Sequence, residues 1–487
     1  MHKHSAAPRS TAATASFLVV LVAVSAWSML TSLVVPVLPV IQHDLHTSQN
    51  TITWVLTAYL LAASVATPIV GRIGDSHGKK KTLIVVLTLF AVGVVLAAVA
   101  TSAWVMIAAR AIQGVGGAIL PLGFGILRER LPAERVGSAV SATAAMVAVG
   151  GGLGIVLAGP IASALSYHFL FWLPLVLVLA AILAAALVVP ESPAPDRTRL
   201  NAAPAVTLAG WLVTLLLAVS EGGSWGWTAP ATLILLAATV VLCALWIRSE
   251  LRSANPLVDM QMMRIPAVWT TNLVALLFGM CMYATLGLLP QFVQTPASAG
   301  YGFGATATAA GLYMLPMTAV MFAAGLLAAP MTIRFGPRAV LFAGAVLTTA
   351  PLAVLAWAHD NPWEIYLASG VLGAGIGLAY AAASQIVVTA VPAHQTGIAS
   401  GMNANIRTIG GSIGNAVTAG VVTAHLRTDG LPTQTGYTTG FAVLVVVGIA
   451  AAAASLLIPR GSAATPQPDQ PSAPGTHTTP LPTNATR

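Results

Sequence analysis

The residues of this sequence that are best placed to do chemistry are polar side chains inside long apolar segments. Arg110 stands in the segment Arg110-Ala-Ile-Gln113-Gly114, which is flanked by apolar residues. A guanidinium in hydrocarbon is costly unless it is hydrogen-bonded, so an arginine there is a functional candidate by default. The alternative is that Arg110 only ties helices together through backbone carbonyls.

A second arginine, Arg407, also lies within an apolar segment. Asn403 and Asn405 flank it, and Tyr380 lies on the preceding apolar segment. Polar groups on neighbouring helix turns either line a central cavity or hydrogen-bond adjacent helices to one another. Both interpretations stay open from the residues alone.

Two glycine-bearing stretches are suited to positioning these groups. In Gly71-Arg-Ile-Gly-Asp75-Ser-His-Gly78-Lys79-Lys80, Gly71 permits close helix approach, Gly78 permits a tight turn, and Asp75 can pair with a base or cap a neighbouring helix. The other stretch has small residues four apart, which allow close helix packing. Its key positions are Gly150, Gly154, Gly159 and Pro160.

The composition shows what kind of element carries these residues. Of 487 residues, 57% are hydrophobic and 7% are charged, whereas a soluble domain carries roughly 25% charged residues. Apolar segments of about 20 residues, the length that crosses a bilayer as a helix, recur along the chain. We therefore predict an all-α membrane protein. The two cysteines and the scattered acids predict no disulfide framework and no metal site, and no phosphate-binding loop supports direct ATP drive.

The apolar segments predict fourteen transmembrane helices. We expect a cytoplasmic tail at 1–16, six helices in 17–190, two extra central helices in 205–248, six helices in 265–459 and a disordered cytoplasmic tail at 460–487. With this count, 18 of the 21 Lys and Arg residues fall in loops on one side, Arg427 falls on the other, and Arg110 and Arg407 lie within helices. Because basic loops face the cytoplasm, both termini are predicted to be cytoplasmic. This clustering between helices also argues against nucleic-acid binding.

An internal repeat divides the chain into two related halves. The stretch that begins Pro132-Ala133 is similar to the one that begins Pro392-Ala393, and the same offset of 260 residues places Gly150 on Gly410. Two six-helix halves related by an axis along the membrane normal explain the repeat.

Taken together, the motifs resemble the major facilitator superfamily, and within it the fourteen-helix drug:proton antiporter branch, over about residues 17–460. The Asp75 stretch resembles the loop that latches the cytoplasmic side of that family. The Arg110 stretch resembles a motif implicated in proton transfer, and the Gly150 stretch resembles, imperfectly, a motif of exporters. The resemblance implies a monomeric, non-enzymatic secondary transporter in the bacterial cytoplasmic membrane. It would export small amphiphilic molecules (drugs, antibiotics or metabolites) by alternating access, driven by the proton gradient without another cofactor.

The sequence departs from this branch in helix 1, where Leu30 occupies the position of an expected acidic residue. All thirteen acidic residues lie in loops, at helix ends or in the tail. We therefore expect a neutral, zwitterionic or anionic substrate rather than a permanent cation, and coupling, if present, through Asp75, Glu221 or Asp44. An uncoupled facilitator, an importer and a lipid-handling protein remain alternatives.

The predicted site residues fall into three groups. Proton coupling and gating are assigned to Arg110, Asp75, Gln113, Glu221 and Asp44. Conformational roles are assigned to Gly71, Gly78, Lys79, Lys80, Gly114, Gly150, Gly154, Gly159 and Pro160. The substrate cavity is assigned to Trp27, Thr31, Tyr59, Arg110, Gln291, Gln294, Tyr313, Tyr380, Asn403 and Arg407.

Overall fold

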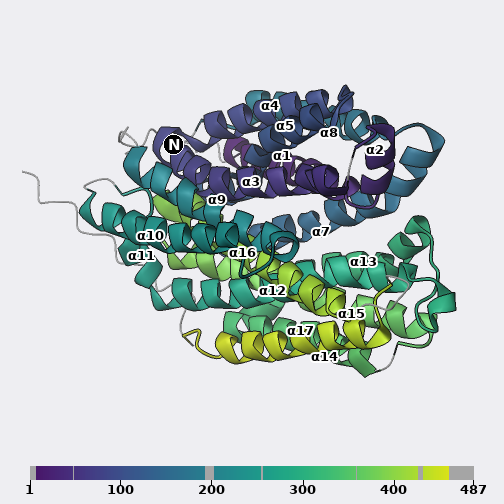
Figure 1. Ribbon diagram of the computed structural model, residues 1–487. Coiled ribbons are helices and arrows are strands. Elements are labelled where there is room, and N and C mark those ends of the chain that lie inside the picture. Colours follow the sequence, from purple (N-terminus) through teal and green to yellow (C-terminus); the bar gives the residue numbers. More distant parts are fainter. Residues whose placement is uncertain are drawn as a thin grey trace, which may run out of the picture.

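A computed structural model describes residues 7–47, 49–191, 202–253, 256–357, 359–425 and 431–459, and most of them are helical (Figure 1). The first half comprises α1 (Ala7–Leu33), α2 (Leu38–Asp44), α3 (Gln49–His77), α4 (Lys79–Ala98), α5 (Ala103–Gln113), α6 (Ile119–Arg130), α7 (Ala133–Ala164) and α8 (Phe169–Val188). The central pair is α9 (Ala202–Trp225) and α10 (Pro230–Arg252). The second half comprises α11 (Met260–Arg264), α12 (Pro266–Gln294), α13 (Ala307–Phe335), α14 (Pro337–Trp357), α15 (Pro362–Ala390), α16 (Thr396–Thr423) and α17 (Gln434–Ser455).

The predicted all-α membrane architecture is confirmed. Within the described residues, 13 helical segments are long and apolar enough to cross a membrane, α5 and α6 counting together as one. The helix predicted to be the thirteenth, α16, has 28 residues, about 42 Å of helix, but its composition is too polar to meet the same criterion. Asn403, Asn405 and Arg407 on α16 are all buried, so these three polar side chains are enclosed by protein.

The two halves pack in corresponding ways. A side chain at Gly154 on α7 would place its Cβ 2.6 Å from the backbone oxygen of Met29 on α1. Gly414 on α16 makes the same kind of approach to the backbone oxygen of Met280 on α12. Gly414 is 260 residues after Gly154, and Met280 is 251 residues after Met29. The halves contact one another along α3 with α16 and along α7 with α13. Figure 1 shows the first half, in purple and blue, above the second half, in green and yellow.

Of the central pair, α9 packs against α3 and α16 at this junction, and α10 packs against α9. Glu250, in the last turn of α10, is buried and anchors the following segment. Its carboxylate accepts hydrogen bonds from the backbone N–H of Leu257 at 2.8 Å and of Val258 at 3.1 Å, and from Trp246 Nε1 at 3.0 Å. This anchor holds the start of the second half against the central pair.

Two helix boundaries differ from the prediction. The first helix begins at Ala7, not at Phe17, so residues 7–16 are helical and not a tail; Pro8 is tolerated because the first turn needs no N–H donor. Helix α9 continues to Trp225, so Glu221 lies within the helix and not in the connecting loop. Residues 1–6 and the predicted tail 460–487 lie outside the described residues.

Candidate functional site

A cavity of about 210 Å³ lies between the two halves. Trp27, Thr31 and Tyr59 line it from the first half, and Tyr380 and Arg407 line it from the second. Arg407 is the only charged side chain among the described residues that line the cavity. The cavity therefore combines apolar and aromatic walls with one cation, and no described carboxylate faces it.

Neutral groups satisfy the guanidinium of Arg407. Nη2 donates to the Tyr380 hydroxyl at 3.0 Å, Nη1 donates to Asn403 Oδ1 at 3.4 Å, and the guanidinium carbon lies 4.0 Å from the centre of the Tyr380 ring. Asn403 in turn donates to Asn272 Oδ1 on α12 at 2.9 Å. Because these partners are uncharged, the positive charge of Arg407 is not cancelled locally and attracts electron-rich groups in the cavity.

Arg110 does not line the cavity, contrary to the prediction. It is 1% exposed, donates to Gln113 Oε1 at 2.7 Å and to the backbone oxygen of Val55 at 3.3 Å, and lies over the ring of Tyr59 at 4.5 Å. Gln113 Nε2 donates to the backbone oxygen of Gly93 on α4 at 2.9 Å. The arginine is therefore behind the cavity wall and ties α5 to α3 and, through Gln113, to α4.

Tyr59 separates Arg110 from the cavity. Its hydroxyl accepts a hydrogen bond from Trp27 Nε1 at 3.0 Å and lies 3.2 Å from Thr31 Oγ1. Both partners line the cavity. A group bound against Trp27 or Thr31 therefore touches the residue on which the Arg110 guanidinium rests.

The glycines after Gln113 shape the same wall. Residues Gly114–Ala118 form a 3-10 turn between α5 and α6, where the sequence predicted one uninterrupted helix. A Cβ at Gly114 would lie 2.7 Å from the backbone nitrogen of Ala63 on α3, and one at Gly117 would lie 2.5 Å from Thr67 Oγ1. The absence of side chains here lets α3 pack directly against the turn, which fixes the position of Tyr59.

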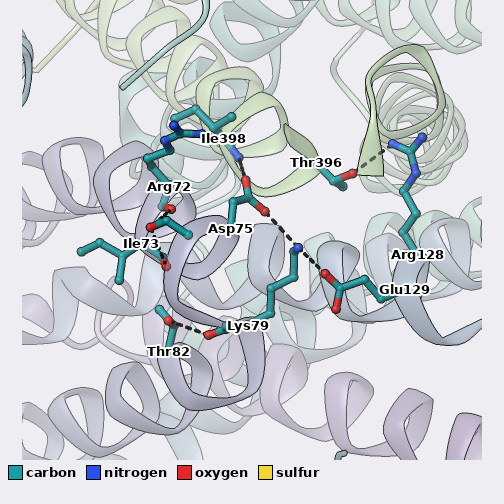
Figure 2. A network of polar contacts seen from close by, with 11 residues as sticks. Arg72, Ile73, Asp75, Lys79, Thr82, Arg128, Glu129, Thr396 and Ile398 are labelled. Carbon is teal, nitrogen blue, oxygen red and sulfur yellow. Dashed lines mark hydrogen bonds and ion pairs between the residues drawn. The ribbon is translucent and has the colours of Figure 1, made fainter. Parts of the chain in front are cut away.

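At one end of the bundle, polar residues connect the two halves; we call Asp75, Lys79, Arg128, Glu129, Thr396 and Ile398 the Asp75 cluster (Figure 2). Asp75, in the last turn of α3, accepts the Ile398 N–H of α16 at 3.0 Å. Lys79 Nζ lies 3.1 Å from Asp75 Oδ1 and 2.5 Å from Glu129 Oε1. Gly78, with a φ of 103°, lets α4 start directly after α3 and brings Lys79 back onto Asp75.

A second pair of contacts in the cluster also crosses between the halves. Arg128 on α6 donates to Thr396 Oγ1 at 2.9 Å and to the backbone oxygen of Val388. Nearby, a Cβ at Gly71 would lie 2.8 Å from the backbone oxygen of Gly397. Lys80 is outside the cluster, because its Nζ donates to the backbone oxygen of Ala186 on α8.

The two halves also meet between the cavity and the Asp75 cluster. A second, small cavity of about 10 Å³ there is lined by residues of both halves, among them Phe124, Val387 and Ser400. This is no more than one water molecule requires. Residues of both halves would therefore have to move apart for a substrate to pass through this small cavity.

The predicted glycines of α7 contact both neighbouring helices. Gly150 and Gly154 face the backbone of α1. A Cβ added at Gly159 would lie 2.9 Å from Thr308 Oγ1 on α13. Pro160 is exposed and lies inside α7, which continues to Ala164. Gly152, which the sequence analysis did not single out, packs against Thr318 of the second half.

Four further predicted cavity residues lie elsewhere. Gln291 and Gln294 are exposed near the end of α12. Tyr313 stacks on Phe303 and Tyr366 away from the cavity, and Asn403 stands behind Arg407.

Conversely, the sequence analysis missed several wall residues, although Ser28 and Ser32 share the face of α1 that carries Trp27 and Thr31. The missed wall residues include Ser28, Ser32, Ser64, Tyr283, Met317, Met321 and Thr408.

The acidic coupling candidates occupy different environments. Asp75 and Glu221 are 5% and 8% exposed, whereas the Asp44 side chain is 45% exposed and lies 3.4 Å from His43 Nδ1. Next to Glu221, the Ser220 hydroxyl is 3.3 Å from that of Thr57, which places this end of α9 against α3. Leu30 is fully buried in the hydrophobic core and does not line the cavity.

Comparisons with known proteins agree with this architecture. The chain is 26% identical over 398 residues to the tetracenomycin C resistance and export protein of Streptomyces glaucescens, covering 81% of this chain and 73% of that one. It is 27% identical over 393 residues to the probable actinorhodin transporter of Streptomyces coelicolor, covering 78% and 67%.

Solved structures share the fold. The proton:xylose symporter XylE superposes with a TM-score of 0.64 at 14% identity, covering 91% of this chain and 95% of that one. The human organic anion transporter MFSD10 superposes with a TM-score of 0.62 at 16% identity, covering 91% and 99%. The sequence model of the Major Facilitator Superfamily matches residues 16–414 and 295–483. The chain therefore belongs to the major facilitator superfamily of membrane transporters, as predicted, and its relatives include proteins named for tetracenomycin C resistance and export and for actinorhodin transport.

Proposed function

We propose that this chain exports small amphiphilic molecules, such as an antibiotic, a drug or a metabolite, across a bacterial cytoplasmic membrane. The observation that carries the proposal is the cavity between the two halves, together with the contacts that join the halves in the Asp75 cluster. The names of the relatives from Streptomyces, for tetracenomycin C resistance and export and for actinorhodin transport, support the substrate class, and the first of them supports the direction.

The proposed mechanism is alternating access. Basic loops favour a cytoplasmic position for the end that carries the Asp75 cluster. The cluster then acts as a cytoplasmic latch, since Asp75 and Arg128 of the first half hold the backbone and a hydroxyl of the second half. Release of these contacts would let the halves rock apart and admit substrate from the cytoplasm. Their re-formation would close that side before the other side opens and releases the substrate.

The charge of the cavity supports a neutral, zwitterionic or anionic substrate. A permanent cation there would meet Arg407 and no described carboxylate, so it would be repelled in a region of low dielectric constant. Aromatic walls from Trp27, Tyr59 and Tyr380 suit an apolar, flat body. An electron-rich head group would lie beside Arg407.

Proton antiport is part of the proposal and requires a buried acid outside the cavity. Asp75 and Glu221 fit this requirement better than the exposed Asp44, because both are buried among the helices. Arg110 would act through Tyr59 and not by contact with substrate. The departure at Leu30 favours a second candidate function, an uncoupled facilitator of the same substrates.

The test is transport by the purified chain in liposomes that contain a pH dye, with an imposed pH gradient. The compounds are cationic, neutral and anionic aromatic amphiphiles, applied to the wild type, Glu221→Gln, Asp75→Asn and, as the exposed control, Asp44→Asn. Proton release driven by neutral or anionic compounds, lost in a buried-acid variant but not in the control, supports antiport. Equilibration of compounds without proton movement identifies a facilitator. Transport of permanent cations alone would contradict the charge argument.

A further inference from the structure

The side chain of Asn405 is buried in the wall of the central cavity without a hydrogen-bond partner. It is 2% exposed, and neither Oδ1 nor Nδ2 forms a hydrogen bond with any described residue. A buried donor or acceptor that stays unsatisfied is costly. Its neighbour Asn403 differs, since it binds both Asn272 and Arg407. The amide of Asn405 therefore has free hydrogen-bonding capacity that faces the cavity.

Asn405 lies where the two halves meet. One turn earlier on α16, a Cβ at Gly401 would be 3.2 Å from the backbone oxygen of Thr67 on α3. Ser64, one turn before Thr67, also lines the cavity, and its hydroxyl also forms no hydrogen bond with a described residue. Two residues that line the cavity thus carry three buried polar atoms without a hydrogen bond to a described residue: the two amide atoms of Asn405 and the hydroxyl oxygen of Ser64.

We propose that Asn405 recognises a donor and an acceptor that lie side by side on the substrate. A primary amide presents one N–H and one C=O in the same plane, which pairs with a lactam, an imide or an enolised β-dicarbonyl group. This inference rests on the proposed function, because it takes the cavity as the substrate site, and it narrows the substrate class. An anionic carboxylate offers only acceptors and is left to Arg407.

The remaining walls suit a flat ring system attached to such a group. Trp27, Tyr59 and Tyr283 provide aromatic surfaces, and Met317 and Met321 provide adaptable apolar contacts. A cavity of about 210 Å³ has room for a fused ring system of two or three rings. The expected ligand is therefore a fused aromatic compound with a lactam, imide or enolised dicarbonyl edge.

The test is a binding cycle between the protein and a matched pair of neutral ligands. Tritiated 1,8-naphthalimide and its N-methyl derivative are titrated against the full chain in nanodiscs, with empty nanodiscs as background. Methylation removes the N–H donor and keeps both carbonyl groups. The proteins are the wild type, Asn405→Leu, Asn405→Ala and the control Asn415→Leu, which changes an exposed asparagine further along α16. Asn405→Ala only removes atoms, so it keeps the test available if the leucine disturbs folding.

The wild type is expected to bind the imide about tenfold more tightly than the N-methyl compound, the effect of one unsatisfied buried hydrogen bond. Either substitution of Asn405 should reduce this ratio to within about twofold, whereas Asn415→Leu should preserve it. The same N-methyl ligand, with the same added bulk, is titrated against all four proteins. The change in the ratio of the two affinities between proteins therefore isolates the hydrogen bond. A ratio that persists without Asn405, or a wild type that binds both compounds equally, overturns the inference while leaving the cavity a binding site. A wild type that binds neither also overturns it, and the liposome experiment then decides the transport function separately.

Discussion

Replacing Asp75 by alanine should open the bundle at the Asp75 end. Most of the charged contacts of the cluster are internal to the first half, since Lys79 and Glu129 both belong to it. The carboxylate of Asp75 crosses to the second half through the Ile398 N–H at 3.0 Å, and Arg128 provides the other crossing contacts. Asp75→Ala therefore removes one of the two polar connections, and Lys79 keeps Glu129 as its partner.

The expected effect follows from the type of bond that is lost. A hydrogen bond to a charged group contributes about 1.5–3 kcal/mol, which corresponds to a shift of about 10- to 150-fold in the ratio of closed to open molecules. Asp75→Asn should give a smaller shift, because an amide oxygen still accepts the Ile398 N–H without the charge. Arg128→Ala should act in the same direction, because its partners Thr396 and Val388 are in the second half.

Electron–electron double resonance measures this shift directly. Spin labels at Lys81→Cys and Ala393→Cys, exposed positions on opposite halves, report the separation in a background without Cys243 and Cys281. The population at long distance should rise in Asp75→Ala and stay unchanged in the control Asp44→Ala. If both Asp75→Ala and Arg128→Ala left the distance distribution unchanged, the contacts would not hold the halves together and the latch argument would be refuted.

Three further predictions concern packing and the two arginines. Gly154→Val should lower the Tm by several degrees in a thermal melt, because overpacking against the Met29 backbone costs about 1–3 kcal/mol. The control Gly420→Val should leave the Tm unchanged, because Gly420 has open space around it. Arg110→Ala should lower proton-coupled transport at least about tenfold. It should leave substrate affinity within about threefold in an equilibrium binding assay, because Arg110 does not line the cavity. A loss of affinity equal to the loss of transport would refute this separation of transport from binding. Arg407→Gln should weaken the binding of anionic compounds about tenfold or more and change the binding of neutral compounds little. Equal weakening of both classes would show that the charge of Arg407 does not select substrates.

The sequence by itself determined the helices, their order and the family. Inside a bilayer every backbone polar group must be satisfied within the helix, so apolar length locates the spans other than α16. The early start of α1 at Ala7 escaped prediction, because Pro8, Arg9 and the serine and threonine residues that follow make residues 7–16 too polar to be read as part of a span.

Tertiary structure decided which side chains face the cavity. Length and hydropathy do not determine the rotation of a helix about its axis, which depends on its contacts with neighbouring helices. Asn403 and Asn405 are two residues apart on α16, yet the first binds Asn272 on α12 while the second faces the cavity unsatisfied. Likewise, Arg110 carries the most conspicuous buried charge of the sequence but rests behind Tyr59. These assignments follow from close backbone approaches, such as that of Gly114 to α3, which one helix considered alone cannot specify.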